Sequence, residues 1–293
     1  MSDPWRARYQ PSSDRAGGTA GEYEQQEQRI REKSANILHK ILVLSGKGGV
    51  GKSTVAAHLA WALALRGSRT GLLDADINGP TIPLLMGLAG QRFRVLEPVA
   101  VLEQLQVMSI AFLLDDPDSP TIWRGPLKGG VIRQFIADVE WGPLDYLVVD
   151  LPPGTGDEPL TVGQMFPDAD GGVIVTTPQE ASLSVCRKAI NFLHALKLPV
   201  LGVIENMSGF VCPHCGQRTD VLMSGGGEDM AARMGVPFLG RVPLAPEIAA
   251  LGDQGRPLLG PGASEAVRLA FSATVDELLR GLQQRQSPAQ AAE

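Results

Sequence analysis

This sequence contains few cysteines and has no excess of basic charge. Its 293 residues include three cysteines, too few and of the wrong parity for a fold built on disulfides. Lysine and arginine total 26 against 32 acidic residues, which gives a net charge of −6, and no local basic cluster stands out. A broad nucleic-acid-binding surface or an anionic-membrane footprint needs such a cluster. We therefore expect neither nucleic acid nor a membrane as a partner.

Long apolar runs and targeting signals are also lacking. No uninterrupted apolar stretch approaches the roughly 20 residues that span a bilayer. The first six residues, Met-Ser-Asp-Pro-Trp-Arg, lack the basic start and apolar run of a secretory signal. Together with the few cysteines, these absences predict a cytoplasmic protein.

Apolar residues are sparse at both ends of the chain. Residues 1–34 are polar and mixed in charge, and residues 283–293 are similar. Segments this poor in apolar area offset little of the entropy lost on ordering. We therefore predict a flexible polar tail over residues 1–34, a single domain over 35–282 and a frayed C-terminus over 283–293.

Between these ends, short apolar runs alternate with segments of helical period. Continuous apolar runs are typical of strands buried on both faces. The alternation predicts an α/β fold with a doubly wound, mostly parallel sheet and helices on both faces. The expected strands are 41–44, 70–73, 107–110, 146–149, 172–176, 200–204 and 238–242, and the expected helices are 53–66, 127–138, 182–196, 227–234 and 264–282.

A glycine-rich phosphate-loop motif follows the first of these strands. The segment Gly-Lys-Gly-Gly-Val-Gly-Lys-Ser-Thr matches G-x-x-x-x-G-K-[ST] between a strand and a helix. In such loops backbone N–H groups surround phosphate oxygens, the lysine Lys52 reaches the β- and γ-phosphates, and Ser53 ligates magnesium. The less specific alternative is a glycine-rich turn without a ligand. The predicted binding residues are Gly46, Lys47, Gly48, Gly49, Val50, Gly51, Lys52, Ser53 and Thr54.

The lysine directly after the first glycine marks a subgroup of such loops. The nine residues from Gly46 to Thr54 resemble the deviant Walker A loop of the nitrogenase iron protein, ParA/MinD-like ATPases and Mrp-type ATPases. This resemblance implies that ATP is the nucleotide and that the chain forms a homodimer. It also implies that Lys47 reaches across the dimer to the partner's phosphates. An exposed loop lysine without that role is the alternative.

Acidic residues end two further predicted strands. Carboxylates at the carboxyl ends of strands beside a phosphate loop serve the magnesium ion and the attacking water. Asp150 resembles the Walker B aspartate that holds magnesium through water, and Asp76 resembles the switch aspartate that orients or activates the water. Asp74 and Asp157 are weaker candidates. Strand-terminal aspartates can also be turn formers without a catalytic role.

An asparagine ends another predicted strand. The side-chain amide of Asn206 has both hydrogen-bond donors and acceptors, and both are needed to recognise the edge of an adenine base. In the superfamily that the phosphate loop resembles, the corresponding asparagine contacts the base, and residues 242–246 resemble the loop that flanks it. A turn residue is the alternative for Asn206.

The two cysteines of Cys-Pro-His-Cys have the spacing of half a metal site. Cys212 and Cys215 can hold one metal or one corner of a cluster, whereas tetrahedral thiolate sites normally need four ligands. The pair alone could also be half of a zinc ribbon or a redox dithiol. Cys186 falls in a predicted helix and is expected to pack there, and His214 is expected to be exposed or to act as a donor outside the ligand set. A symmetric dimer would supply four thiolates from two copies.

A longer match extends the resemblance over about residues 36–260. Residues 72–80, 123–126, 141–157, 177–179 and 205–208 together look like Mrp/ApbC-type iron–sulfur carrier ATPases. The resemblance implies slow ATP hydrolysis and a labile 4Fe–4S cluster that the CxxC pairs of a homodimer hold. It also implies an upstream cluster donor and apo iron–sulfur proteins that receive the cluster. Two departures from the family pattern are the segment Met-Ser-Gly-Gly-Gly at 223–227, where Phe-Gly-x-Gly-Gly is expected, and Ala245 in place of an aspartate.

Three other functions fit parts of the sequence. A ParA/MinD-like positioning ATPase with a structural zinc site is the main alternative, although the apolar stripe of residues 267, 271, 275, 278 and 282 favours a core-packing helix over a membrane-binding one. A nitrogenase-type electron donor takes its thiolates from two separated cysteines per subunit and therefore fits less well. A zinc-stapled ATPase without cluster transfer differs only in the metal that the cysteines bind.

Overall fold

The computed structural model describes residues 20–90, 97–113, 125–212, 214–215 and 217–290 of the chain. Several parts of the sequence-based predictions fall on positions outside the described residues. These are most of the predicted tail, over residues 1–19, the last three residues of the predicted frayed end, Trp123 and Arg124 of the family match, and Pro213 within the CxxC segment.

Eight strands form one sheet in the order β10-β7-β6-β1-β5-β2-β4-β3. Neighbouring strands are parallel except for the edge pair β3 and β4. The predicted doubly wound, mostly parallel α/β fold is thereby confirmed. The strands of this sheet are β1 (Ile37–Ser45), β2 (Thr70–Asp74), β3 (Val99–Leu102), β4 (Leu105–Ser109), β5 (Leu144–Asp150), β6 (Gly171–Thr176), β7 (Val200–Glu205) and β10 (Phe238–Arg241).

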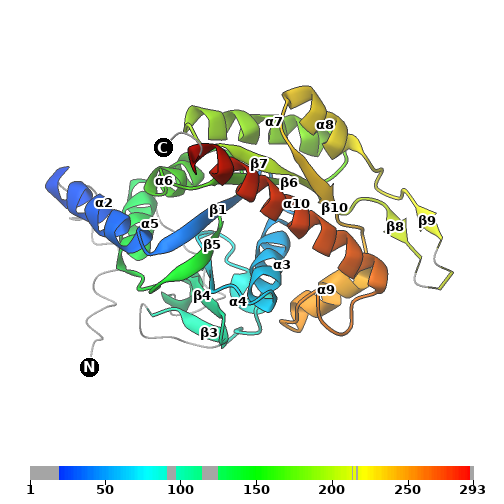
Figure 1. Cartoon of the computed structure of the whole chain (residues 1–293), viewed down its shortest axis with the longest axis horizontal. Helices are drawn as coiled ribbons and strands as arrows, with labels where there is room; N and C mark the ends of the chain where they lie inside the picture. Colours follow the sequence, from blue (N-terminus) through cyan, green and yellow to red (C-terminus); the bar gives the residue numbers. More distant parts are fainter. Residues whose placement is uncertain (1–19, 91–96, 114–124, 213, 216, 291–293) are drawn as a thin grey trace.

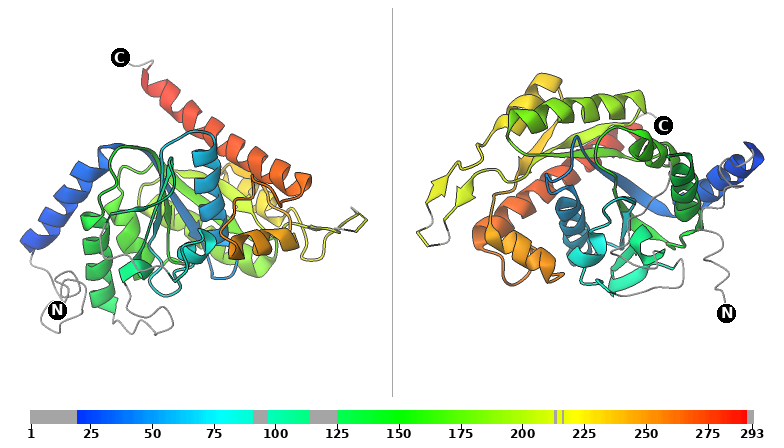
Figure 2. Two further views of the ribbon diagram at one scale, coloured as in Figure 1. Left: turned by 90° about the horizontal axis from the view of Figure 1, so that it is seen from below. Right: turned by 180° about the vertical axis from the view of Figure 1, so that it is seen from behind.

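Helices cover both faces of the sheet (Figures 1 and 2). On one face α3 lies against β1, β2 and β5, and α10 lies against β7 and β10. On the other face α7 packs on β6 and α8 on β7, while α5 and α6 pack against each other. The described helices are α2 (Ala20–Ser34), α3 (Lys52–Leu65), α4 (Ile82–Leu85), the 3-10 turn η2 (Ile110–Leu113), α5 (Gly125–Asp138), α6 (Asp157–Met165), α7 (Glu180–Ala195), α8 (Gly226–Met234), α9 (Pro246–Asp253) and α10 (Glu265–Gln290).

The apolar patterns of the sequence account for this layering. The central strands β2 and β6 are buried along their whole length, as strands between two helical layers must be. The expected stripe on α10 is a core-packing face, because its five members are each at most 3% exposed. They are Val267, Phe271, Val275, Leu278 and Leu282.

The carboxyl ends of the parallel strands meet at one edge of the sheet. Asp74 and Asp150 are register partners at the ends of β2 and β5, and Glu205 at the end of β7 lies opposite Thr176 of β6. The loops that follow these strands therefore gather at the same edge, which is where open α/β sheets bind ligands. None of the helices in the described ranges is long and apolar enough to cross a membrane.

The two ends of the chain contain more helix than the sequence predicts. Instead of a flexible tail, residues 20–34 form α2, which packs against α5. Ile30 is buried there, Arg29 pairs with Asp138 at 3.3 Å, and the Lys33 ammonium donates to the carbonyl of Ala137 at 2.7 Å. One buried aliphatic side chain and these contacts hold a helix whose average composition indicated disorder.

The C-terminal boundary differs in the same way. The sequence analysis predicts a frayed end from residue 283, whereas α10 continues to Gln290. The Arg285 guanidinium donates to the carbonyl of Val200 at 3.1 Å and so fastens this extension to the start of β7. Helical hydrogen bonding that began in the apolar part of α10 continues into the polar part at little further cost.

A small antiparallel hairpin lies outside the main sheet. Its strands β8 (Phe210–Val211) and β9 (Arg218–Thr219) project from the body of the protein near the end of the sheet that carries β7 and β10 (Figure 1). The sequence analysis did not predict these strands, nor the edge strand β3 and the helices α4, α6 and α9. All are short, and short elements leave little periodic signal.

Candidate functional site

The phosphate loop joins the end of β1 to the start of α3. Gly51 precedes the helix with φ +82°, a left-handed conformation that glycine adopts without strain. A Cβ atom at Gly51 would lie 2.2 Å from the side-chain nitrogen of Asn206, and one at Gly46 would lie 2.4 Å from the carbonyl carbon of Val185. The glycines at these two positions are therefore required by close approach of other chain segments.

Lys52, Ser53 and Asp150 form one compact polar cluster behind the loop. The Lys52 ammonium lies 2.7 Å from Asp150 Oδ1 and 3.2 Å from the Ser53 hydroxyl, which donates to Asp150 Oδ2 at 2.6 Å. Asp150 is fully buried and Lys52 is 6% exposed. The buried carboxylate is thus satisfied by a charge and a hydroxyl, as burial of an ionised group requires.

Asp74 and Asp76 line the same edge from the end of β2. Asp74 is fully buried, accepts from the Ser109 hydroxyl at 2.9 Å and from the Asp76 backbone N–H at 3.2 Å. Burial, aided by the neighbouring Asp150 carboxylate, raises the pKa of Asp74 to about 8. Asp76 accepts from the backbone N–H groups of Asn78 and Gly79. Both carboxyl groups therefore have hydrogen-bond partners at this edge, and those of Asp76 are backbone groups of the turn that follows β2.

The remaining predicted nucleotide residues differ in exposure. Lys47 is exposed at the tip of the loop, and its carbonyl accepts from the Ser45 hydroxyl at 2.9 Å. Asn206 is buried, and its amide group donates to the carbonyl of Val50 at 2.9 Å. The asparagine that the sequence assigns to the adenine edge therefore also braces the phosphate loop.

A cavity of about 320 Å³ lies beside the loop that follows β5. Its lining includes Asn78, Pro153, Asp157 and Thr161. The Asn78 amide donates to the Glu158 carboxylate at 2.7 Å, so the loop after β2 and the first turn of α6 are joined across this space. Asp157, a weaker candidate in the sequence analysis, is exposed as the first residue of α6.

The two cysteines of the CxxC segment lie at the end of the β8–β9 hairpin. Cys212 donates its backbone N–H to the carbonyl of Gln217 at 3.0 Å, which closes the turn. Backbone N–H groups of His214 and Cys215 direct hydrogen bonds at the Cys212 sulfur and lower the pKa of its thiol. Cys215 and His214 are exposed, and both cysteines are reduced. The turn therefore favours the ionised form of the Cys212 thiol.

Within the described residues, no third metal-ligating side chain joins the thiol pair. Among the residues that the structure describes, no group of three or more histidine, cysteine, aspartate or glutamate side chains could hold a metal ion. Cys186 is fully buried in α7, and burial raises the pKa of its thiol. It belongs to the core and stands apart from the hairpin.

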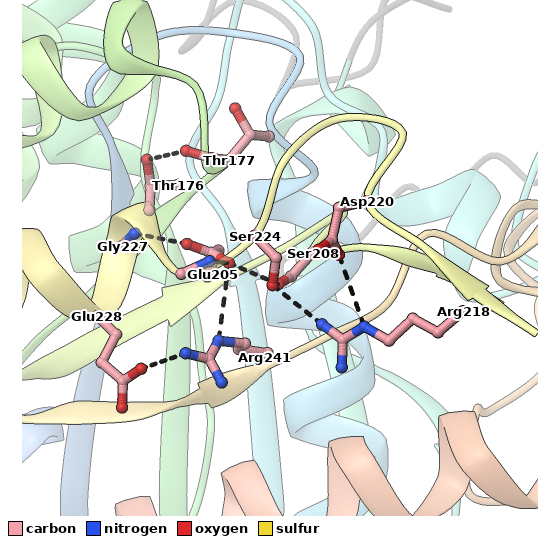
Figure 3. Close-up of polar contacts among 11 residues, drawn as sticks. Thr176, Thr177, Glu205, Ser208, Arg218, Asp220, Ser224, Gly227, Glu228 and Arg241 are labelled. Atoms are coloured by element: carbon pink, nitrogen blue, oxygen red, sulfur yellow. Dashed lines mark hydrogen bonds and ion pairs between the residues drawn. The ribbon is translucent and has the colours of Figure 1, made fainter.

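The sequence analysis missed a buried carboxylate between the two sites. Glu205 is fully buried at the end of β7 and accepts from the Ser208 hydroxyl and from the backbone N–H groups of Gly225 and Gly227 (Figure 3). Arg241, its register partner on β10, approaches to 3.9 Å. A glutamate that ends an apolar strand, followed by a glycine triplet, is the signal that could have found it.

Comparison with known proteins identifies the family of this chain. The family model that matches this chain is described as ParA: NUBPL iron-transfer P-loop NTPase, and it spans residues 36–279. An iron-sulfur cluster carrier protein of Methanocaldococcus jannaschii is 47% identical over 274 residues, which are 92% of this chain and 94% of that protein. A protein of the same name from Methanococcus maripaludis is 45% identical over 85% of this chain and 87% of its own length.

Solved structures show the same fold. A nucleotide-binding protein of Archaeoglobus fulgidus in complex with ADP is 43% identical, with a TM-score of 0.68 over 78% of this chain and 91% of that chain. The cell division ATPase MinD of Pyrococcus furiosus has a TM-score of 0.62 over 83% of this chain and 99% of its own, but at 21% identity it shows the fold alone. The family resemblance drawn from the sequence is thus confirmed. Since the family model spans most of the chain, this protein belongs to the NUBPL iron-transfer family of ParA-type P-loop NTPases.

Proposed function

We propose that this protein is an ATP-binding and slowly hydrolysing iron–sulfur cluster carrier. Two copies would hold a labile 4Fe–4S cluster and deliver it to apo iron–sulfur proteins. The observation that carries the proposal is the pairing, on one chain, of a phosphate loop with an exposed two-thiol turn that has no further ligand within the described residues. The relatives named as iron-sulfur cluster carrier proteins support it.

The phosphate loop supplies the nucleotide chemistry. In this proposal Lys52 leaves its ion pair with Asp150 for the β- and γ-phosphates, and the helix α3 directs its positive end at the same oxygens. Ser53 and Asp150 are the oxygen donors that suit magnesium, which would neutralise phosphate charge when bound. Asp76 orients the attacking water. Asn206 contacts the base with the donor and acceptor atoms of its amide that are not bonded to Val50.

The two thiols of each chain supply half of a cluster site. A 4Fe–4S cluster held by thiolates takes four of them, and two hairpins related by a twofold axis provide that number. Exposed Lys47 fits the same dimer, because a lysine at the loop tip can reach the partner's phosphates. Reduced surface thiols suit a reducing compartment such as the cytoplasm. An upstream donor loads the cluster, and ATP turnover accompanies its binding or transfer.

Anaerobic reconstitution with iron and sulfide tests this function. We expect about one 4Fe–4S cluster per dimer, with the absorption band near 400 nm that such clusters give, because four thiolates limit the stoichiometry. The double variant Cys212→Ala with Cys215→Ala should lose the band, whereas Cys186→Ala, which removes a buried thiol, should keep it.

Two results would contradict the carrier function. One is an unchanged band in the double variant, and the other is stoichiometric zinc that resists replacement in anaerobically purified protein. The second result would favour a zinc-stapled ATPase, since zinc with two chains' thiolates makes a closed structural site. Transfer of the cluster to an apo-acceptor, followed by the acceptor's own absorption, then tests delivery.

A further inference from the structure

Glu205 and Asn206 are adjacent residues that face two different sites. The side chain of Asn206 donates to the carbonyl of Val50 in the phosphate loop at 2.9 Å. The side chain of Glu205 accepts from the segment that follows the cysteine hairpin. The two side chains therefore connect the two sites through one short stretch of backbone at the end of β7.

A continuous series of hydrogen bonds leads from Glu205 into the hairpin. The Ser208 hydroxyl donates to Glu205 Oε1 at 2.5 Å and lies 3.0 Å from the Ser224 hydroxyl. Arg218 on β9 donates to Ser224 at 2.9 Å (Figure 3). Arg218 is the register partner of Val211, which directly precedes Cys212. The series therefore ends one residue from the first metal-binding thiol.

Backbone contacts fix the base of the hairpin in the same region. Ser208 donates its N–H to the carbonyl of Val242 at 2.9 Å, and Leu244 donates to the carbonyl of Gly209 at 2.8 Å. Residues 242–246 are the segment that the sequence analysis places beside the nucleotide base. The hairpin thus starts from the wall of the predicted nucleotide site.

Two residues with left-handed backbone lie beside the serines of this series. Met207 has φ +56° and Met223 has φ +71°, and each directly precedes a serine, Ser208 and Ser224. Non-glycine residues hold such conformations only where surrounding contacts impose them, and such positions are typical of switch segments. Both positions therefore adjoin the series that joins Glu205 to the hairpin.

We propose that Glu205 is a positioning residue that couples the nucleotide state of the phosphate loop to the geometry of the Cys212 and Cys215 thiols. Nucleotide binding rearranges the backbone around Val50 and Gly51, Asn206 follows because no space separates it from Gly51, and Glu205 transmits the movement through Ser208 and Ser224. The inference deepens the proposed function, because it assigns the regulation of the same thiol pair.

The test follows thiol alkylation in the cluster-free protein, so that it does not depend on cluster loading. Alkylation rates of Cys212 and Cys215 are measured by peptide mass spectrometry without nucleotide, with saturating ADP and with saturating non-hydrolysable ATP analogue. Coupling free energies between sites typically correspond to about a fivefold change or more. We expect at least about this change in the wild-type rate at Cys212, and a smaller change overturns the coupling.

The variants then locate the coupling. Glu205→Gln and Ser224→Ala should each bring the ratio of rates close to one at saturating nucleotide, and Ser224→Thr, which keeps the hydroxyl, should restore it. Ser224→Ala removes one hydroxyl from a partly exposed loop, so it provides the answer even if Glu205→Gln does not fold. Ratios that stay closer to the wild-type value than to one in both variants would overturn the role of Glu205.

Glu228→Gln is the matched control. Glu228 is exposed and contacts Arg241, the same arginine that approaches Glu205, but it takes no part in the series to Ser224. Its ratio should equal the wild-type value. If nucleotide alters thiol reactivity while reconstitution yields no cluster, the proposed function fails and the coupling stands. If reconstitution yields the cluster while nucleotide leaves thiol reactivity unchanged, the carrier function stands and the coupling fails.

Discussion

The phosphate loop and the cysteine hairpin differ in how much structure holds them. The loop lies between a buried central strand and a helix, and its Lys52 is buried and paired with the buried Asp150 at the end of β5. The hairpin has two strands of two residues each, and Cys215 at its end is exposed. The buried charges behind the loop are paired within one chain, whereas the hairpin presents two thiols with no third metal-ligating side chain among the described residues.

This difference in structural support indicates which of the two sites can change its geometry. A loop fixed by core packing binds its ligand with little rearrangement of the fold. A short exposed hairpin has low local stability, and its geometry depends on the contacts at its base. Substitutions at the loop should therefore have large effects, and substitutions at the hairpin should have smaller ones. The expectations below run from the largest effect to the smallest.

Lys52→Ala is expected to have the largest effect. It removes the ammonium that serves the phosphates and leaves the Asp150 carboxylate buried with the Ser53 hydroxyl as its remaining side-chain donor. Loss of one donor that stabilises transition-state charge typically costs about 100- to 1000-fold in rate. A steady-state ATPase assay should show a loss of this size, with Lys188→Ala on the exposed side of α7 as control. Unchanged hydrolysis would refute the assignment of the loop.

Acid should destabilise the helix that begins at the phosphate loop. His58 on α3 is buried without a hydrogen-bond partner, and burial lowers its pKa from 6.5 to about 4. Below pH 6.5 the unfolded chain binds a proton at His58 that the folded state excludes. The free energy of unfolding is therefore highest above pH 6.5 and falls by about 3 kcal/mol as the pH falls to 4.

Urea unfolding across this pH window measures the effect of His58. His58→Leu should remove that part of the pH dependence, while His194→Gln, at an exposed site on α7, should keep it. A wild-type slope identical to that of His58→Leu would contradict the linkage.

Gly51→Ala should damage the loop by close approach and backbone strain. The added Cβ meets the Asn206 amide at a φ of +82°, so the bond to Val50 is displaced. We expect a loss of about 1 to 3 kcal/mol in the free energy of unfolding. Thermal melts and ADP titration measure the effect. Gly48→Ala, where a Cβ meets no atom within 4 Å, should leave the melting temperature close to wild type. Equal losses in the two variants would show that the Asn206 contact is unimportant.

The smallest effect concerns the hairpin thiol. Since turn amides lower the pKa of Cys212, its alkylation should be a few-fold faster than that of cysteine in a peptide of residues 210–219 at neutral pH. The advantage should vanish well above pH 8.5, where ordinary thiols are also ionised. Identical rate profiles for protein and peptide would mean that the folded turn does not activate this thiol.

Local sequence sufficed for the parallel strands of the sheet and for the phosphate loop, but not for the edge strand β3. The central strands were found because each is a continuous apolar run, and burial on both faces imposes that pattern. The loop was found because phosphate binding requires glycines and a lysine at fixed spacing. Helix α2 was missed because it is held by Ile30, by the ion pair of Arg29 with Asp138 and by the hydrogen bond from Lys33 to α5, contacts that composition does not reveal.

The sequence by itself determined the chemistry of this protein, namely the phosphate loop, the aspartates at strand ends and the thiol pair. Only the tertiary structure decided which of these groups act together. Asp74 and Asp150 are far apart in the chain, yet parallel register places them side by side, where mutual repulsion and burial raise the pKa of Asp74. Glu205 can be buried only because folding brings Ser208 and the backbone N–H groups of Gly225 and Gly227 to its carboxylate, since a buried charge must find such donors.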